Sequence, residues 1–142
     1  MFQGTSLLSL DAKGRMTMPS RHREVLSSAS NLEVTITRHP DGCLLIYPRP
    51  VWEERKAALT QLGYGARALQ RIVLGSAVDL TVDNAGRLLI PADLRTLAGL
   101  KKEVVLVGLG THFEVWDADK LAQLEKEALE AGFEAAAAGF QF

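Results

Sequence analysis

The sequence predicts an α+β fold, mostly β, made of two β-β-α-β-β units related by a pseudo-twofold axis. The first observation is an internal repeat. Two segments that begin 72 residues apart share the pattern D-x-x-G-R-x-x-x-P-x-x-x-R. The first is LDAKGRMTMPSRHREVL, from Leu10, and the second is VDNAGRLLIPADLRTLA, from Val82. The second observation is size, because a unit of about 45 residues rarely closes a core without disulfides, metals or partners. We therefore expect the copies to complete one core by pairing or interleaving strands.

The first half of each unit follows from local sequence. Alternating leucines in TSLLSL predict the first strand, and Asp-Ala-Lys-Gly or Asp-Asn-Ala-Gly predicts a tight turn after it. A short apolar strand then runs into Pro19 or Pro91, and proline is well suited to the first position of a helix. We expect that helix to end near Ser27 in the first copy and at Gly99, a C-terminal cap, in the second.

The second half of each unit is a predicted hairpin. Its strands are LEVTIT and CLLIYP in the first copy and KEVVLV and FEVWDA in the second, with turns at residues 39–42 and 108–112. Helical apolar spacing predicts helices in an insert from Pro50 to Gly75, broken at 63–65, and another helix at 119–131. The predicted organisation is module 1 at 5–51, a helical insert at 52–76, module 2 at 77–120, and a C-terminal helix and tail at 121–142.

Composition excludes some classes of protein. The chain has 142 residues, a formal net charge of −1 and one cysteine, Cys43. No uncharged apolar run approaches the ~18 residues of a membrane span. A secretory signal requires a positive charge before its apolar stretch, and none precedes the first apolar stretch of this chain. A single cysteine fits a reducing compartment. We therefore expect a cytoplasmic protein with no membrane partner.

The repeated element is a turn that presents an arginine. Asp11 and Asp83 can accept hydrogen bonds from backbone N–H groups two or three residues on, which closes the turn. Gly14 and Gly86 can adopt the positive φ that the end of such a turn requires. These four residues are the predicted turn-forming set.

The arginines are the predicted functional groups. Arg15 and Arg87 leave from the first residue of the strand after each turn, and Arg23 and Arg95 lie one to two helical turns into the next helix, where they can flank the same surface. A structural alternative stays open, because Asp and Gly are common turn residues and the arginines can pair with local acids.

The residues resemble the MraZ family of bacterial regulators, built from two SpoVT/AbrB-type modules. The doubled D-x-x-G-R pattern, the start MFQGTSLLSLDAKGRMTMPSRHRE, the segment ARALQRIVLGSA and the second copy DNAGRLLIPADLR carry the resemblance, which covers 1–129. It implies a swapped-hairpin, AbrB-like, barrel-like core and a ring-shaped homo-oligomer. It also implies sequence-specific binding to direct repeats of duplex DNA in the promoter of the division and cell-wall gene cluster, with contacts from Arg15 and Arg87, and hence nucleoid association.

Charge is unevenly distributed along the chain. Residues 1–102 hold 14 basic and 9 acidic side chains, whereas residues 103–142 hold 2 and 8. The near-neutral total therefore hides a basic body and an acidic C-terminal stretch, which we expect to point away from DNA. The first copy has Lys13 and Arg21 where the second has Ala85 and Asp93. We hypothesise that the first copy supplies the main DNA contact. The predicted DNA-binding residues are Lys13, Arg15, Arg21, Arg23, Arg87 and Arg95.

An enzyme is the first alternative. The three histidines lack metal-ligand spacing, and the Gly108–Gly110 segment is not followed by the Gly-Lys-Ser of a phosphate loop. Cys43 lies in an apolar strand, where a buried structural thiol is expected. We expect no catalysis, metal, cofactor or small-molecule substrate. The second alternative is an antitoxin-like or scaffold interaction protein, which the intact second copy and the short tail disfavour.

Overall fold

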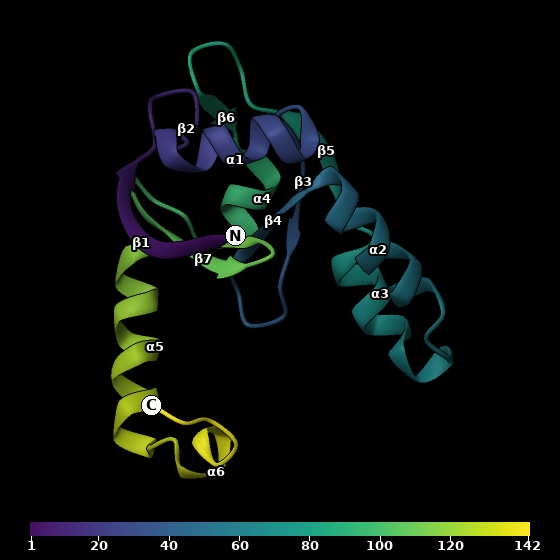
Figure 1. Ribbon diagram of the computed structural model, residues 1–142, viewed down its shortest axis with the longest axis vertical. Helices are drawn as coiled ribbons and strands as arrows, with labels where there is room; N and C mark the ends of the chain where they lie inside the picture. Colours follow the sequence, from purple (N-terminus) through teal and green to yellow (C-terminus); the bar gives the residue numbers. More distant parts are fainter.

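Both repeats fold in the order β-β-α-β-β in the computed structural model, which describes residues 1–142 (Figure 1). The first repeat consists of β1 (Phe2–Ser9), β2 (Arg15–Thr17), α1 (Ser20–Ser30), β3 (Glu33–Arg38) and β4 (Leu44–Pro48). The second consists of β5 (Val78–Thr81), β6 (Arg87–Leu89), α4 (Ala92–Leu97), β7 (Glu103–Gly110) and β8 (Phe113–Asp117).

The two repeats exchange strands. One antiparallel sheet has the order β1-β7-β8-β4-β3-β5, and β2 pairs with β6 in a separate two-stranded ribbon. The first strand of each repeat pairs with the third strand of the other. Interchanging the two repeats therefore reverses the strand order of the sheet, as a twofold axis requires. The α+β fold with two interleaved copies is thereby confirmed.

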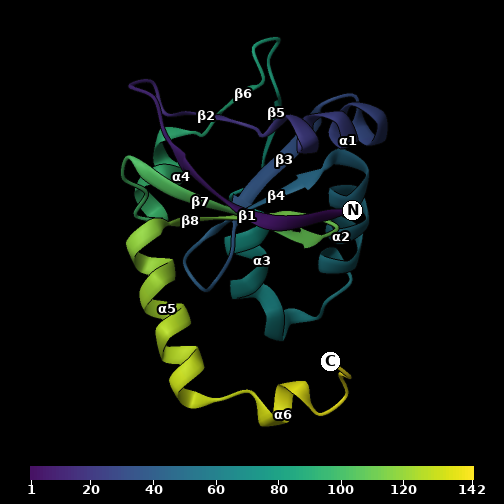
Figure 2. The same ribbon diagram turned by 60° about the vertical axis from the view of Figure 1, so that its left-hand side comes forward.

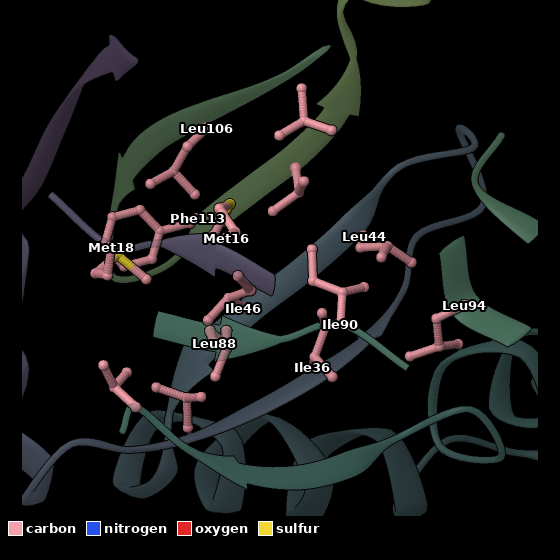
Figure 3. Close-up of a cluster of buried hydrophobic side chains, with 14 of the residues drawn as sticks. Met16, Met18, Ile36, Leu44, Ile46, Leu88, Ile90, Leu94, Leu106 and Phe113 are labelled. Atoms are coloured by element: carbon pink, nitrogen blue, oxygen red, sulfur yellow. The ribbon is translucent and has the colours of Figure 1, made fainter. Parts of the chain in front are cut away.

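The pseudo-twofold axis passes between equivalent residues. Met16 of β2 lies opposite Leu88 of β6, its counterpart in the repeat, and Leu45 of β4 lies opposite Glu114 of β8. Met16 and Leu88 are fully buried between the ribbon and the large sheet, in the same cluster as Phe113 (Figure 3). Both repeats thus contribute to one hydrophobic core, as the small size of each unit requires.

Helices between and after the repeats lie outside this core. The insert forms α2 (Arg49–Thr60), a 3₁₀ turn (Tyr64–Ala66) and α3 (Arg67–Val73). It covers the outer face of β4, where the rings of Tyr47 and Trp52 are buried with their centroids 5.8 Å apart. The C-terminal arm, α5 (Ala118–Ala131) and α6 (Glu134–Ala137), projects from the body (Figure 2). None of the helices combines the length and apolar character that crossing a membrane requires.

Three predicted helix boundaries are corrected. Pro19 and Pro91 are the N-cap residues, with φ of −53° at both, so each helix begins one residue after its proline. The first helix continues beyond Ser27 to Ser30, because Asn31 adopts a left-handed conformation with φ of 54° and caps it there. The second helix ends at Leu97 with Ala98 as its C-cap residue, and Gly99 follows in a left-handed conformation with φ of 65°.

Candidate nucleic-acid interface

The two D-x-x-G-R turns project from one end of the molecule. The first turn (residues 11–14) joins β1 to β2, the second turn (residues 83–86) joins β5 to β6, and the pairing of β2 with β6 brings them to the same side (Figures 1 and 2). The C-terminal arm, with Glu125 and Glu127 exposed, extends from the opposite end. The end that carries the turns is therefore the candidate nucleic-acid interface.

The first turn is organised by one carboxylate. Asp11 Oδ1 accepts hydrogen bonds from the backbone N–H groups of Lys13 (3.0 Å) and Arg15 (2.8 Å), and Oδ2 accepts one from Arg15 Nε (2.6 Å). Gly14, with φ of 85°, completes the turn by donating its N–H to the Asp11 carbonyl. These bonds, led by that from the Arg15 N–H, lower the pKa of Asp11.

The second turn repeats the arrangement. Asp83 Oδ1 accepts from the N–H groups of Ala85 (2.9 Å) and Arg87 (2.8 Å), and Oδ2 lies 3.3 Å from Arg87 Nε. Gly86 has a φ of 78°, and the hydrogen bond from the Arg87 N–H again leads the causes that lower the pKa of Asp83. In both turns the aspartate accepts two backbone hydrogen bonds and the glycine has a positive φ.

Each turn holds its arginine by one edge only. The Nε of Arg15 and of Arg87 is bonded to the turn aspartate, which is the local pairing that the structural alternative predicts. Neither Nη group of either arginine has a protein partner, and the side chains are 26% and 36% exposed. Two N–H-bearing nitrogens per arginine, held in a fixed plane, therefore remain available to an external acceptor.

Arg23 and Arg95 each lie beside the turn of the other copy, across the pseudo-twofold axis. The guanidinium of Arg95, from the second copy, packs on Gly14 of the first turn, and that of Arg23 packs on Gly86 of the second. Both arginines therefore flank the surface that carries the two turns, each beside the turn of the other copy because the strands are exchanged. Arg95 Nε donates to the carbonyl of Ile90 (3.0 Å), whereas Arg23 Nε is buried without a partner.

The remaining predicted residues differ in position. Lys13 is exposed on the first turn. Arg21 lies along β1, where its Nη2 donates to Ser6 Oγ (3.2 Å) and approaches Gly4. The structure thus places Lys13, Arg15 and Arg95 together at the first turn, and Arg87 and Arg23 together at the second, but it does not bring Arg21 to either.

A groove lies beside each turn. The first groove, with a volume of about 610 Å³, is lined by Leu10, Asp11, Ala12, Arg95, Leu100, Lys101 and Lys102. The second groove, of about 430 Å³, is lined by Ser20, Arg23, Glu24, Ser27, Leu32, Val82, Asp83, Asn84 and Gly86. Sequence reasoning missed the two lysines of the first groove. The adjacent pair Lys101 and Lys102 was visible in the sequence, but its place beside the first turn follows from the strand exchange.

Two of the histidines and the single cysteine lie away from the two turns. His22 is buried against the rings of Phe2 and Phe113, and His112 lies against Tyr47 with ring centroids 4.9 Å apart. Burial is the leading cause that lowers the pKa of both histidines. Cys43 is buried as expected, and burial chiefly raises the pKa of its thiol to about 12. No three His, Cys, Asp or Glu side chains come together in an arrangement suited to a metal ion.

Comparison with known proteins agrees with the repeat. A family model described as "MraZ protein, putative antitoxin-like" matches the chain twice, at residues 1–71 and 73–141. The chain is similar to proteins named transcriptional regulator MraZ: 54% identical to that of Herminiimonas arsenicoxydans over 132 residues, or 93% of each chain, and 52% identical to that of Bordetella pertussis over the same share. It is 52% identical to the Cupriavidus taiwanensis protein over all 142 residues, the full length of both.

Proposed function

Because the chain belongs to the MraZ family, whose similar members are named transcriptional regulators, we propose that it regulates transcription by binding duplex DNA directly. The proposed site is a set of direct repeats in the promoter of the division and cell-wall gene cluster, engaged by a closed ring of subunits. Such a protein works in the cytoplasm, in association with the nucleoid.

One observation carries the proposal. Two turns at one end of the subunit each present an arginine whose Nε is fixed by an aspartate and whose Nη groups have no protein partner. A guanidinium held in this way is ready to donate two hydrogen bonds to a guanine edge or to a phosphate. Fixing the turn beforehand also reduces the entropy lost on binding, because the backbone is already in its final conformation.

Repetition of subunits supplies the specificity that one turn lacks. A single bidentate arginine contact discriminates between bases by only ~1 to 3 kcal/mol. When several subunits are joined, binding of the second and later sites becomes intramolecular, and weak contacts add on one DNA. Direct repeats spaced to match neighbouring subunits are the DNA arrangement that uses this effect.

Exposed apolar side chains support self-association. Tyr64 is 81% exposed beside α3, Leu129 is 71% exposed on α5, and Phe133 is 52% exposed beyond it. These residues lie on the insert and on the C-terminal arm, two different parts of the surface. Contact between two different surfaces of like subunits is head-to-tail, and such contacts close into a ring when the rotation permits.

The test is a mobility shift on the DNA upstream of the protein's own gene, across a salt series and with one, two or more repeats. We expect affinity to rise with repeat number and to fall steeply with salt, because phosphate contacts release counterions. Light scattering on the same sample should give a multiple of the 15.5 kDa subunit. A stable monomer, or equal affinity for scrambled DNA, would contradict the proposal.

A second candidate function is antitoxin-like binding of another protein, because the family model that matches the chain is described as antitoxin-like. Its prediction differs, because a protein partner would be bound whether or not repeat DNA is present. Loss of such a partner on removal of residues 118–142, with DNA binding unchanged, would favour this function for the arm.

A further inference from the structure

We propose that the first groove binds the phosphate backbone of the DNA, and that Lys102 and Arg95 of the second copy complete this site on the first copy's turn. The inference rests on the proposed DNA-binding function and adds residues and an orientation to it. The second groove, at the pseudo-symmetric position, is not a phosphate site.

The strand exchange places Lys102 in the first groove. The backbone N–H of Leu10 donates to the carbonyl of Lys102 at 2.8 Å, which holds the start of β7 beside the end of β1. Arg95 is held at the same groove by the Ile90 carbonyl and by its packing on Gly14. The backbone of the groove is therefore fixed before any ligand arrives.

Lys102 is the basic group of this groove that is left free. Lys101 Nζ lies 3.4 Å from Asp117 and 3.8 Å from Asp119, so its charge is directed toward the start of α5. Lys102 is exposed and has no carboxylate within ion-pair distance. A lysine without a partner at the wall of an open groove suits a phosphate, which binds it as a point charge.

One carboxylate also lines the first groove. Asp11 faces the same space, but its oxygens already accept three hydrogen bonds, one of them from the Arg15 guanidinium at 2.6 Å. That ion pair offsets the negative charge of Asp11 at the site where Arg15 would meet DNA. The balance of the groove lining is three basic side chains to one acidic.

The second groove has the opposite balance. One basic side chain, Arg23, faces two acidic ones, Glu24 and Asp83. In the second groove, Leu32 occupies the position that Lys102 has in the first. The carbonyl of Leu32 accepts the N–H of Val82, just as the carbonyl of Lys102 accepts the N–H of Leu10. The pseudo-twofold axis therefore relates the backbones of the two grooves but not their charges.

This asymmetry has a consequence for the DNA sequence. A subunit with two equal sites about a twofold axis would bind equally well in both orientations and would suit inverted repeats. A subunit with one phosphate groove binds in one orientation only. Identical subunits that follow one another around a ring then require sites that follow one another in the same direction, as direct repeats do.

The test compares four single variants on one duplex that contains the direct repeats upstream of the protein's own gene. We expect Lys102→Gln to weaken binding about tenfold. The fall of log affinity with log salt should also become less steep, by about 0.9 for each engaged subunit. Lys102→Arg should restore both quantities because it keeps the charge. Lys126→Gln, which removes an exposed charge from α5, should leave both unchanged, and unfolding curves will show that all variants are folded.

The outcomes separate this inference from the proposed function. If Lys102→Gln binds as tightly as Lys126→Gln while Arg15→Ala loses binding, the groove assignment is overturned and DNA binding by the turns remains. If the wild-type protein itself does not distinguish the repeats from scrambled DNA, both proposals fail. Equal affinity for direct and inverted repeats of matched spacing would overturn the orientation argument.

Discussion

The guanidinium group of Arg95 packs directly on Gly14, although the two residues belong to different repeats. Arg23 packs on Gly86 in the same way across the pseudo-twofold axis. The carbonyls of Gly14 and Gly86 also accept the N–H groups of Ile90 (3.1 Å) and Met18 (2.8 Å). Each turn is therefore fixed on one side by its own aspartate and on the other by the opposite repeat.

Gly14→Ala should destabilise the protein by ~1 to 3 kcal/mol, because φ at this position is 85° and a Cβ would collide with the Arg95 guanidinium. The free energy of unfolding from urea denaturation measures the effect. Gly65→Ala is the matched control, since its Cβ would meet nothing within 4 Å and its φ is not positive. Equal stability of the two variants would show that the close approach at Gly14 is unimportant.

Arg15→Ala should weaken binding to repeat DNA about 10- to 100-fold, the range of one bidentate contact, and Arg87→Ala should weaken it less. Arg15 stands beside Lys13 and the basic first groove, whereas Arg87 stands beside Ala85 and the acidic second groove. Titration of labelled duplex measures both variants side by side. A loss from Arg87→Ala equal to or larger than that from Arg15→Ala would contradict the hypothesis that the first turn dominates.

The sequence revealed the repeat, the turns and their aspartates, because those features depend on residues close together in the chain. The sequence did not reveal which turn Arg23 and Arg95 each approach, because that depends on which repeat each strand pairs with. Arg23 is close to Arg15 in the chain, but the pairing of β2 with β6 carries α1 toward the second turn. Lys102 was missed for the same reason, since Leu10 and Lys102 meet only through the β1–β7 pairing.

Loss of stability in acid should depend on the turn aspartates. The pKa values of Asp11 and Asp83 are lowered from the ordinary 3.8, so each contributes stability above that value and loses it as the pH falls through the lower folded value. In the double variant Asp11→Asn, Asp83→Asn, the free energy of unfolding should be lower at pH 7 and should fall less between pH 5 and about pH 2. Urea titrations at each pH measure it.

The control for this experiment is Glu130→Gln, which removes one carboxylate from exposed α5, where Glu130 has no ion-pair partner. Its pH profile should follow that of the wild type. If the double aspartate variant also follows the wild type, the turn carboxylates do not carry the acid dependence.

Leu88→Ala should lower the free energy of unfolding by ~2 to 5 kcal/mol, because it opens a cavity where the two repeats meet. Leu88 is fully buried opposite Met16 on the pseudo-twofold axis, whereas the next residue of β6, Leu89, is 50% exposed. Leu89→Ala is therefore the matched control and should cost less than ~0.5 kcal/mol. If the repeats form one core, both urea and thermal unfolding of Leu88→Ala should remain single transitions. Two separate transitions would mean that the repeats are independent, which the exchange of β1 and β5 between them does not allow.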